Sequence, residues 1–379
     1  MPLPPLALYI HLPWCERKCP YCDFNSHAAP HIPEQRYIDA LISDLRSDLH
    51  LVGQREVQSL FIGGGTPSLF SGAAIARLME AVAFHLTLSA DLEATMEANP
   101  GSAEARKFAE FHAAGINRLS LGIQSFSDDQ LQRLGRVHDS DQAIAAVNFA
   151  REAGFGNINI DLMHGLPGQT PALAMADLQQ AISLTPNHVS WYQLTIEPNT
   201  VFHSHPPRLP VEDALADIQA AGETLLADAG YRQYEVSAYS QPGRQCHHNL
   251  NYWGFGDYLG IGAGAHGKIS QTDGSITRYA KRRQPDAYMD SLPNGFISSK
   301  RILQAEEIAG EFMLNALRLN NGFDLTIFEE RTGLGAATIQ DDLLQLSDQG
   351  LLDIGAGRVK TTELGRRFLD DVVGRFFPT

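Results

Sequence analysis

The chain has 379 residues, of which 44% are hydrophobic and 19% charged, a composition typical of a soluble protein that buries one large core and a smaller second one. Its 44 acidic and 29 basic residues give a formal charge of -15, which repels a nucleic-acid backbone and argues against general binding of DNA or RNA. No apolar run is long enough to cross a bilayer, and residues 1–5 lack the basic residues of a secretory signal, so we expect a cytoplasmic protein.

Short runs of strand character alternate with helical periodicity through the first half of the chain. Ser102 and Ser140 stand where helix N-caps are expected, and Gly115 and Gly154 stand where helices should end. Regular alternation of strand and helix predicts a parallel sheet, either open or rolled toward a barrel. The six predicted strands are residues 7–12, 59–62, 93–97, 118–123, 157–163 and 188–194.

Polar residues recur at the carboxyl ends of these predicted strands. Three cysteines follow the first strand, a glycine run at 63–66 follows the second, and Glu97, Gln124 and Asp161 end later ones. In a parallel barrel all these ends meet at one mouth, where active sites lie. The sequence therefore predicts an α/β fold, a partial (β/α)6 TIM-like barrel with one shared site.

The pattern becomes less regular after residue 196. A loop is predicted at 197–210, a helix at 211–229 and an extended run at 231–239. Residues 246–267 mix aromatic residues with six glycines, so we expect a loop with short strands around the barrel mouth.

From about residue 301 the character of the sequence changes. Three helical segments precede a short hairpin, an order that favours a mainly helical, winged-helix-like domain. Many acids accompany its few Lys and Arg residues, so we expect packing or docking rather than DNA binding. The predicted helices are residues 306–319, 325–332 and 336–349, and the hairpin is 351–360. The expected domains are the barrel, 1–240, a connecting region, 241–300, and the C-terminal domain, 301–379.

Cys15, Cys19 and Cys22 supply three thiolates from one loop, whereas the fourth cysteine, Cys246, is remote. This clustering and a reducing compartment argue against a disulfide framework. Thiolates favour zinc or iron-sulfur centres, but a structural zinc site would need a fourth ligand, and the nearby histidines lack the usual paired spacing. A [4Fe-4S] cluster on three thiolates would instead leave one iron open.

The C-x3-C-x2-C spacing, with Tyr21 before the last cysteine, resembles the signature of the radical S-adenosylmethionine (SAM) superfamily. Residues 9–267 resemble one branch of it, which holds oxygen-independent coproporphyrinogen III oxidase and the HemW-type heme chaperones. The matching motifs include Gly-Gly-Gly-Thr-Pro at 63–67 and Asn-Ile-Asp-Leu-Met-His-Gly-Leu-Pro-Gly at 159–168. The resemblance implies a [4Fe-4S] cluster on the three cysteines, with SAM beside it.

The residues that the resemblance assigns to SAM have suitable chemistry. Carboxylates can accept hydrogen bonds from the ribose hydroxyls or the amino group, and an arginine can pair with the SAM carboxylate. A single acid at a strand end is as readily a cap or salt-bridge partner. The implied residues are Tyr9, Tyr21, Gly64, Gly65, Thr66, Glu97, Gln124, Arg136 and Asp161, with weaker matches at Thr195 and His266.

A second motif, His-Asn-Leu-Asn-Tyr-Trp at 248–253, matches the H-N-x-x-Y-W pattern that HemW-type proteins associate with heme. An imidazole can be an axial iron ligand, and aromatic rings can flank an apolar macrocycle. The alternative reading is a core histidine with an aromatic anchor in a loop. The heme candidates are His248, Asn249, Tyr252 and Trp253, with Cys246 and His247 as alternative ligands.

Two departures separate the chain from the oxidase. It enters its first strand by Leu6, without room for the oxidase's N-terminal extension, and Phe24 stands where the oxidase has a further cysteine. The resemblance therefore implies a heme chaperone that binds heme, a [4Fe-4S] cluster and SAM and passes heme to an apo-hemoprotein acceptor, which could be membrane-bound.

Two alternatives stay open: decarboxylation of coproporphyrinogen III by radical SAM chemistry, and a zinc-stabilised structural or docking protein. Whether the protein is an enzyme, which acceptor it serves, how heme is attached, whether SAM is cleaved and how many molecules bind all stay open. So does the oligomeric state, with a homodimer as one option.

Overall fold

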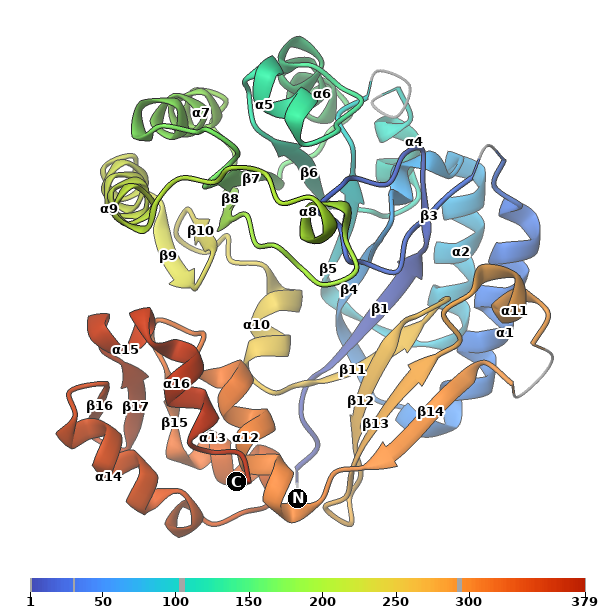
Figure 1. The fold of residues 1–379 in the computed structure, drawn as a ribbon. Helices are drawn as coiled ribbons and strands as arrows, with labels where there is room; N and C mark the ends of the chain where they lie inside the picture. Colours follow the sequence, from blue (N-terminus) through green and yellow to red (C-terminus); the bar gives the residue numbers. More distant parts are fainter. Residues whose placement is uncertain (1, 30, 102–105, 292–294, 379) are drawn as a thin grey trace.

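The computed structural model describes residues 2–29, 31–101, 106–291 and 295–378 (Figure 1). The predicted N-cap at Ser102 lies outside these residues. Among them, twelve strands form one large sheet, in the order β14-β13-β12-β11-β1-β4-β5-β6-β7-β8-β10-β9. The sheet is curved, with helices on its outer side (Figure 1).

Six parallel strands at the centre of the sheet confirm the predicted partial barrel. In three of them, Leu6–Leu12, Arg118–Gln124 and Ile158–His164, the residues are almost continuously buried, as expected for strands covered on both faces. The strands are β1 (Leu6–Leu12), β4 (Glu56–Gly64), β5 (Thr87–Ala98), β6 (Arg118–Gln124), β7 (Ile158–His164) and β8 (His188–Gln193).

Amphipathic helices cover the outer face of these strands. In α1 the buried side chains Tyr37, Leu41 and Leu45 lie at helical spacing against the sheet, and each such burial stabilises the fold by about 1.5–3 kcal/mol. The helices of this layer are α1 (Glu34–Val52), α2 (Gly72–His85), α4 (Phe108–Ala113), α5 (Asp128–Arg133), α6 (Ser140–Glu152), α7 (Pro171–Ser183) and α9 (Glu212–Asp228), with a 3-10 turn at Pro67–Leu69. The short helix α8 (Val201–Ser204) instead lies against the cysteine loop, where the Phe202 N–H donates to the Pro20 carbonyl.

The N-cap of α6 differs from the prediction by one residue. Asp139, rather than Ser140, accepts a hydrogen bond from the Gln142 backbone N–H, and the Gln142 side chain accepts one from the Asp139 N–H. This reciprocal capping box satisfies two free N–H groups of the first turn, which Ser140 inside the helix cannot do.

The region at 246–267, predicted as a loop with short strands, does contain short strands, but it also contains a helix that was not predicted. It contains helix α10 (His247–Trp253), strand β11 (Asp257–Ile261), which pairs in parallel with β1, and the start of an antiparallel extension. Its glycines permit close strand approach, since a Cβ on Gly260 would lie 1.8 Å from the His266 carbonyl oxygen. The extension is β12 (His266–Ser270), β13 (Ile276–Lys281) and β14 (Ile297–Ile302), with α11 at Pro285–Met289.

The other edge of the sheet also differs from the prediction. The extended run at 231–239 is two antiparallel strands, β9 (Arg232–Glu235) and β10 (Ala238–Ser240), because the chain turns back between them. A separate two-stranded piece, β2 (Trp14–Cys15) with β3 (His27–Ala28), closes the cysteine loop at its base.

The C-terminal segment has its own apolar core, centred on Phe312 and Phe328. Helices and a small antiparallel sheet in the order β15-β17-β16 agree with the predicted winged-helix-like arrangement. Phe255 and Ile276, from the connecting region, also pack in this core, and the domain boundaries at 240 and 300 stay a prediction. The elements are α12 (Ala305–Ala316), β15 (Phe323–Asp324), α13 (Leu325–Thr332), a 3-10 turn at Ala336–Thr338, α14 (Gln340–Asp348), β16 (Leu352–Gly355), β17 (Arg358–Thr361), α15 (Glu363–Arg367) and α16 (Leu369–Gly374).

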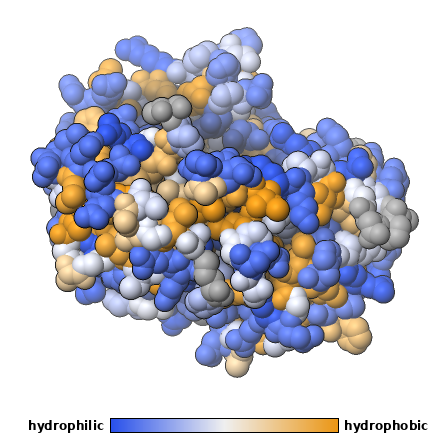
Figure 2. Space-filling model, turned by 90° about the horizontal axis from the view of Figure 1, so that it is seen from below, coloured by the Kyte–Doolittle hydropathy of each residue, from blue (hydrophilic) through white to orange (hydrophobic). Residues whose placement is uncertain are grey.

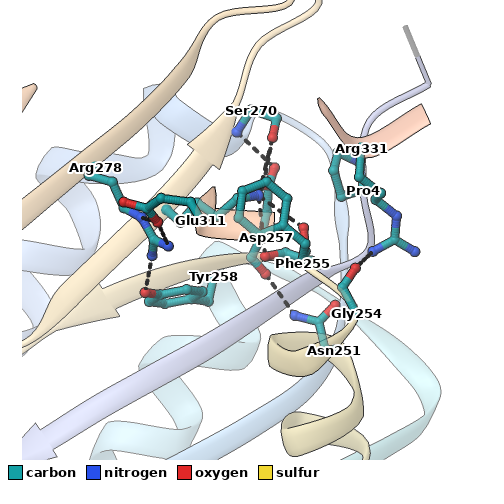
Figure 3. A network of polar contacts seen from close by, with 12 residues as sticks. Pro4, Asn251, Gly254, Phe255, Asp257, Tyr258, Ser270, Arg278, Glu311 and Arg331 are labelled. Carbon is teal, nitrogen blue, oxygen red and sulfur yellow. Dashed lines mark hydrogen bonds and ion pairs between the residues drawn. The ribbon is translucent and has the colours of Figure 1, made fainter. Parts of the chain in front are cut away.

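A buried polar network joins the sheet extension to the C-terminal segment (Figure 3). Asp257 accepts hydrogen bonds from the Lys268 Nζ at 2.9 Å, the Ser270 Oγ at 2.8 Å and the Arg55 Nη1 at 2.8 Å. Arg331 of α13 donates to the Gly254 carbonyl, at 2.9 Å, at the end of α10. Because both Asp257 and Lys268 are buried, neither charge has water as an alternative partner.

The surface of the molecule is mixed. Apolar residues form a broken band across the middle of the face seen in Figure 2, with hydrophilic residues around it. Exposed apolar atoms are normal on soluble proteins, so the band by itself indicates no partner. In the parts of the chain that the structure describes, no helix is both long and apolar enough to span a membrane.

Candidate functional site

The three clustered cysteines face a cavity of about 290 Å³ at the carboxyl ends of the central strands. Backbone hydrogen bonds from Gly65 to Leu12, 2.8 Å, and from Thr66 to Trp14, 2.7 Å, hold the cysteine loop against the end of β4. From the predicted SAM set the cavity brings together Tyr21, Gly64, Gly65, Thr66, Glu97, Gln124, Arg136 and Asp161.

Three predicted SAM residues lie outside this cavity. Tyr9 and His266 line a neighbouring, larger cavity instead. Thr195 is exposed and lines neither cavity. Thr195 and His266, the two weaker matches of the resemblance, therefore do not line the cysteine cavity.

The glycine run at the end of β4 permits close packing against β1 and the cysteine loop. Gly64 has a φ of +122°, a conformation that favours glycine, and a Cβ there would lie 2.7 Å from the His11 ring. A Cβ on Gly65 would lie 2.4 Å from the Trp14 carbonyl oxygen. Larger residues would push the end of β4 away from the cysteine loop.

Two carboxyl groups share the floor of the cysteine cavity. Burial and the nearby Asp161 raise the pKa of Glu97 to about 8, although its Oε2 accepts a hydrogen bond from the Gly64 N–H at 3.1 Å. Burial also raises the pKa of Asp161, which accepts hydrogen bonds from Ser120 at 2.9 Å and Asn159 at 2.8 Å. Glu97 is therefore mostly protonated at neutral pH in the ligand-free protein and can donate a hydrogen bond.

Arg136 supplies the positive charge of this cavity. Its Nη2 donates to the Asn99 Oδ1 and to the Gly122 carbonyl, both at 2.7 Å, and its Nη1 lies 3.6 Å from the Cys19 Sγ. Its Nε–H is buried and has no partner among the described residues. A buried, unpaired N–H beside a thiol group is suited to an anionic ligand such as a carboxylate.

Gln124 has a strained backbone at the same place. Its φ of 72° is unusual for a residue with a side chain and costs about 1 kcal/mol or more. The Tyr192 hydroxyl donates to its Oε1 at 2.7 Å, which fixes the amide toward the cavity. Strain of this kind persists where the surrounding structure fixes the residue, often at functional sites.

The donor set fits an iron-sulfur cluster better than one metal ion. In the described residues no three His, Cys, Asp or Glu side chains are arranged to hold a single ion. Three cysteines nevertheless face one cavity, as a cluster of several irons requires, because its ligands are spread around a larger body. The chemistry of the donors and the unpaired Arg136 Nε–H together fit a cluster with a zwitterionic ligand beside it.

A second cavity, of about 700 Å³, adjoins the first, and its lining includes the aromatic residues Tyr9, Phe24, Tyr252 and Tyr258. Glu97, Gly64 and Phe24 line both cavities and so form a shared wall. Its volume lies within the usual range of pockets for small molecules and cofactors, about 300–1,000 Å³.

His248 lies at the inner end of the second cavity. Its ring centroid is 5.0 Å from that of Phe61 and 6.3 Å from that of Tyr9. Its Nδ1 is buried without a partner in the part of the chain that the structure describes, and burial together with the nearby Arg118 lowers its pKa to about 4. A neutral imidazole with an unpaired ring nitrogen is the form that binds iron.

The remaining heme candidates do not all share this cavity. Tyr252 lies one turn after His248 on the same face of α10 and also lines it, because residues four apart on a helix are neighbours. Trp253 instead packs against the C-terminal segment, with the Arg318 guanidinium 4.3 Å from its ring. Asn249 and His247 do not line the cavity.

Cys246 is turned away from the second cavity as well. It is buried, its thiol lies 3.5 Å from the Glu93 Oε1, and burial raises its pKa to about 12. A thiol in this state is a poor ligand and nucleophile, since both roles need the thiolate. The structure therefore separates His248 and Tyr252 from the other four candidates.

Two family models match this chain: the radical SAM superfamily over residues 9–179 and the HemN C-terminal domain over residues 303–368. The heme chaperone HemW of Escherichia coli K12 is 50% identical over 375 residues, which cover 99% of this chain and 98% of that protein. The chain belongs to the HemW family.

More distant HemW proteins and a solved structure extend the likeness. The Bacillus subtilis heme chaperone HemW is 35% identical and covers 98% of both chains. The E. coli coproporphyrinogen III oxidase, described as a radical SAM enzyme, superposes with a TM-score of 0.84 at 25% identity, over 99% of this chain and 91% of that one. The HemW-family chain therefore has a radical SAM scaffold with a helical C-terminal domain.

Several residues that line the cavities of this HemW-family chain were not predicted. His11 donates from Nε2 to the Asn25 carbonyl at 2.9 Å and accepts at Nδ1 from the Tyr9 hydroxyl at 2.9 Å. Its position in β1, two residues after Tyr9, could have identified it as a site residue from the sequence. Tyr258 and Arg283 gave none, because they approach the cavity through strand pairing of a region that looked like a loop.

Proposed function

We propose that this protein is a heme chaperone that binds heme in the 700 Å³ cavity beside His248 and passes it to an apo-hemoprotein acceptor. A [4Fe-4S] cluster on Cys15, Cys19 and Cys22 and a SAM molecule would occupy the neighbouring cavity. The E. coli relative named a heme chaperone, which is similar over nearly the whole chain, supports this function.

One observation carries the proposal: His248, whose buried Nδ1 has no partner among the described residues, lines a cavity that shares a wall with the cysteine cavity. An isolated core histidine would be expected to find a hydrogen-bond partner, because an unsatisfied buried polar atom costs about 1–3 kcal/mol. An iron ligand would satisfy His248, and the aromatic side chains would shield the macrocycle from water.

The residues of the cysteine cavity would hold and orient the cofactors. The cluster would supply an electron-transfer centre with one open iron for the amino acid end of SAM. The Arg136 Nε–H is available to a carboxylate. The protonated Glu97 and the hydrogen-bonded Asp161 provide a donor and an acceptor for the polar groups of the ligand.

Heme titration of the anaerobically reconstituted protein, with and without SAM, tests this function. We expect saturable heme binding with a characteristic absorption band, followed by transfer when an apocytochrome of the b type is added. Absence of saturable binding, or heme that stays on the protein in the presence of a competent acceptor, would contradict the proposal.

The second candidate is an oxygen-independent coproporphyrinogen III oxidase, favoured by the superposition with the E. coli enzyme. It would convert substrate propionates to vinyl groups by radical SAM chemistry. Incubation of the reconstituted protein with coproporphyrinogen III and SAM, without oxygen, separates the two functions. Vinyl product would refute the chaperone proposal, and we expect none.

The third alternative, a zinc-stabilised docking protein, predicts zinc and no labile sulfide in anaerobically purified material. We expect iron and sulfide instead. We also propose a cytoplasmic location, with the acceptor reached by transient contact. The acceptor's identity and a homodimeric state are the parts of the proposal to be measured by copurification and by mass in solution.

A further inference from the structure

The floor of the second cavity is one row of residues across the sheet. Strand pairing places Phe61 of β4 beside Tyr9 of β1, and Tyr9 beside Gly260 of β11. Farther along, His266 of β12 pairs with Ala280 of β13, which pairs with Ser299 of β14. Residues that pair in register point to the same face of a sheet. Except for Phe61 and Gly260, the members of this row line the cavity.

This row changes in character from its inner to its outer end. The inner end is aromatic, with Phe61 and Tyr9 stacked at 6.4 Å and His248 beside both. The outer end, on β12 to β14, is polar. Neighbouring strands lie about 4.8 Å apart, so the three intervals from β1 to β13 span roughly 14 Å. Protoheme with its side chains has a similar length, and both of its carboxylates lie on one edge.

Arg283 stands at the polar end, just after β13. Its side chain is exposed and lines the cavity, and within the described ranges its guanidinium has no ion pair or hydrogen bond. The other cation of the lining, Lys281, is buried in ion pairs with Asp44 and Asp48. An unpaired arginine in a chain with a formal charge of -15 therefore offers a local site for an anion.

The other ionisable groups of the lining leave this charge uncompensated near neutral pH. Burial lowers the pKa of His266, with the charges of Arg278 and Arg283 adding to the effect, so the ring is neutral. His248 is neutral as well, because burial lowers its pKa. Glu97, with a pKa of about 8, is mostly protonated and lies at the opposite wall, shared with the cysteine cavity.

We infer that Arg283, together with Ser299, which also lines the polar end of the cavity, recognises the propionate carboxylates of the bound heme and so fixes the edge that faces outward. The inference rests on the proposed function and adds the ligand class to it: an apolar macrocycle with carboxylates along one edge. A guanidinium matches a carboxylate with two parallel N–H donors, which a neutral rim cannot do. The carboxylate edge would then lie toward the solvent, and the opposite, apolar edge toward the aromatic end of the cavity.

The test compares protoheme IX with its dimethyl ester on the anaerobically reconstituted full-length protein. We expect the wild type to bind protoheme about tenfold more tightly than the ester, the size of one charge-assisted contact. In Arg283→Ala this preference should fall to about twofold or less, while the affinity for the ester stays unchanged. Arg283→Lys should restore part of the preference, since it keeps the charge and loses the fork.

Arg282→Ala is the matched control. Arg282 precedes Arg283, is also exposed, and donates to the Gly295 carbonyl at 2.6 Å instead of lining the cavity. Its loss should leave the protoheme preference intact. Equal affinity of the wild type for protoheme and ester would overturn the role of Arg283, although heme binding itself would stand. A wild type that binds neither would overturn the chaperone proposal as well.

Discussion

The two neighbouring cavities are built in different ways. The ends of successive parallel strands supply the walls of the cysteine cavity. Its residues therefore follow these strands one by one along the sequence. The second cavity uses a row across six strands and one face of α10, which come from distant parts of the sequence. Under the proposed function, the first cavity would hold the cofactors, and the second, assembled partly by the connecting region, would hold the heme that must leave.

The largest effect that we expect comes from removing the three thiolates, which tests whether the two cavities bind their ligands separately. Replacing Cys15, Cys19 and Cys22 together by alanine should abolish iron and sulfide uptake, because no other group of ligands lies in that cavity. Heme should still bind at His248, in the other cavity. Iron, sulfide and heme analysis after anaerobic reconstitution checks both parts, and uptake equal to that of the wild type would contradict the cluster site.

The second prediction concerns the network that holds the strands of the second cavity. Asp257→Ala leaves the buried Lys268 without its carboxylate and should lower the free energy of unfolding by about 3–5 kcal/mol. Asp353→Ala is the control, since its ion pair with Lys360 is exposed and should contribute less than about 1 kcal/mol. Urea unfolding measures both. A loss at Asp257 no larger than at Asp353 would show that the network adds little.

The shared wall gives a prediction about pH. The folded-state pKa of Glu97, about 8, lies above its ordinary value of 4.5. The protonated carboxyl therefore contributes stability to the fold that is fully present below pH 4.5 and is lost as the pH rises through 8. Glu97→Gln removes this ionisation. At pH 8 the ligand-free variant should be more stable than the wild type by roughly 2 kcal/mol relative to their difference at pH 5. Thermal unfolding across this range tests it, and parallel pH profiles would refute it.

The smallest effect sharpens the assignment within α10. His248→Ala should weaken heme binding about tenfold, or about 1.4 kcal/mol, and change the absorption spectrum, because the iron loses its imidazole. His247→Ala should do neither, since His247 is exposed and does not line the cavity. Heme titration followed by absorbance distinguishes them. An unchanged spectrum in His248→Ala would mean that another group binds the iron.

The sequence predicted the cysteine cavity better than its neighbour for a physical reason. The carboxyl ends of the strands in a parallel barrel converge whatever the strand lengths and loops are. The order of strands along the chain was therefore enough to place Thr66, Glu97 and Asp161 together. The pairing of β11 with β1 joins residues about 250 positions apart, and the glycines that permit it look locally like a loop. Local patterns carry no information about such a partner.

Within α10 the sequence motif also joined residues that the fold separates. Helical spacing explains why His248 and Tyr252 share a face, but the region was predicted as a loop, so this spacing was not used. The contact of Trp253 with Arg318 depends on the C-terminal segment, 65 positions farther along the chain, and has no local signal.

The wall formed by Gly64, Glu97 and Phe24 has a thermodynamic consequence. A ligand that moves or ionises Glu97 in one cavity changes the free energy of filling the other, and reciprocity requires the same factor in both directions. If SAM tightens heme binding, heme must tighten SAM binding equally. One linkage cycle of four dissociation constants would then describe the loaded and unloaded states of the protein.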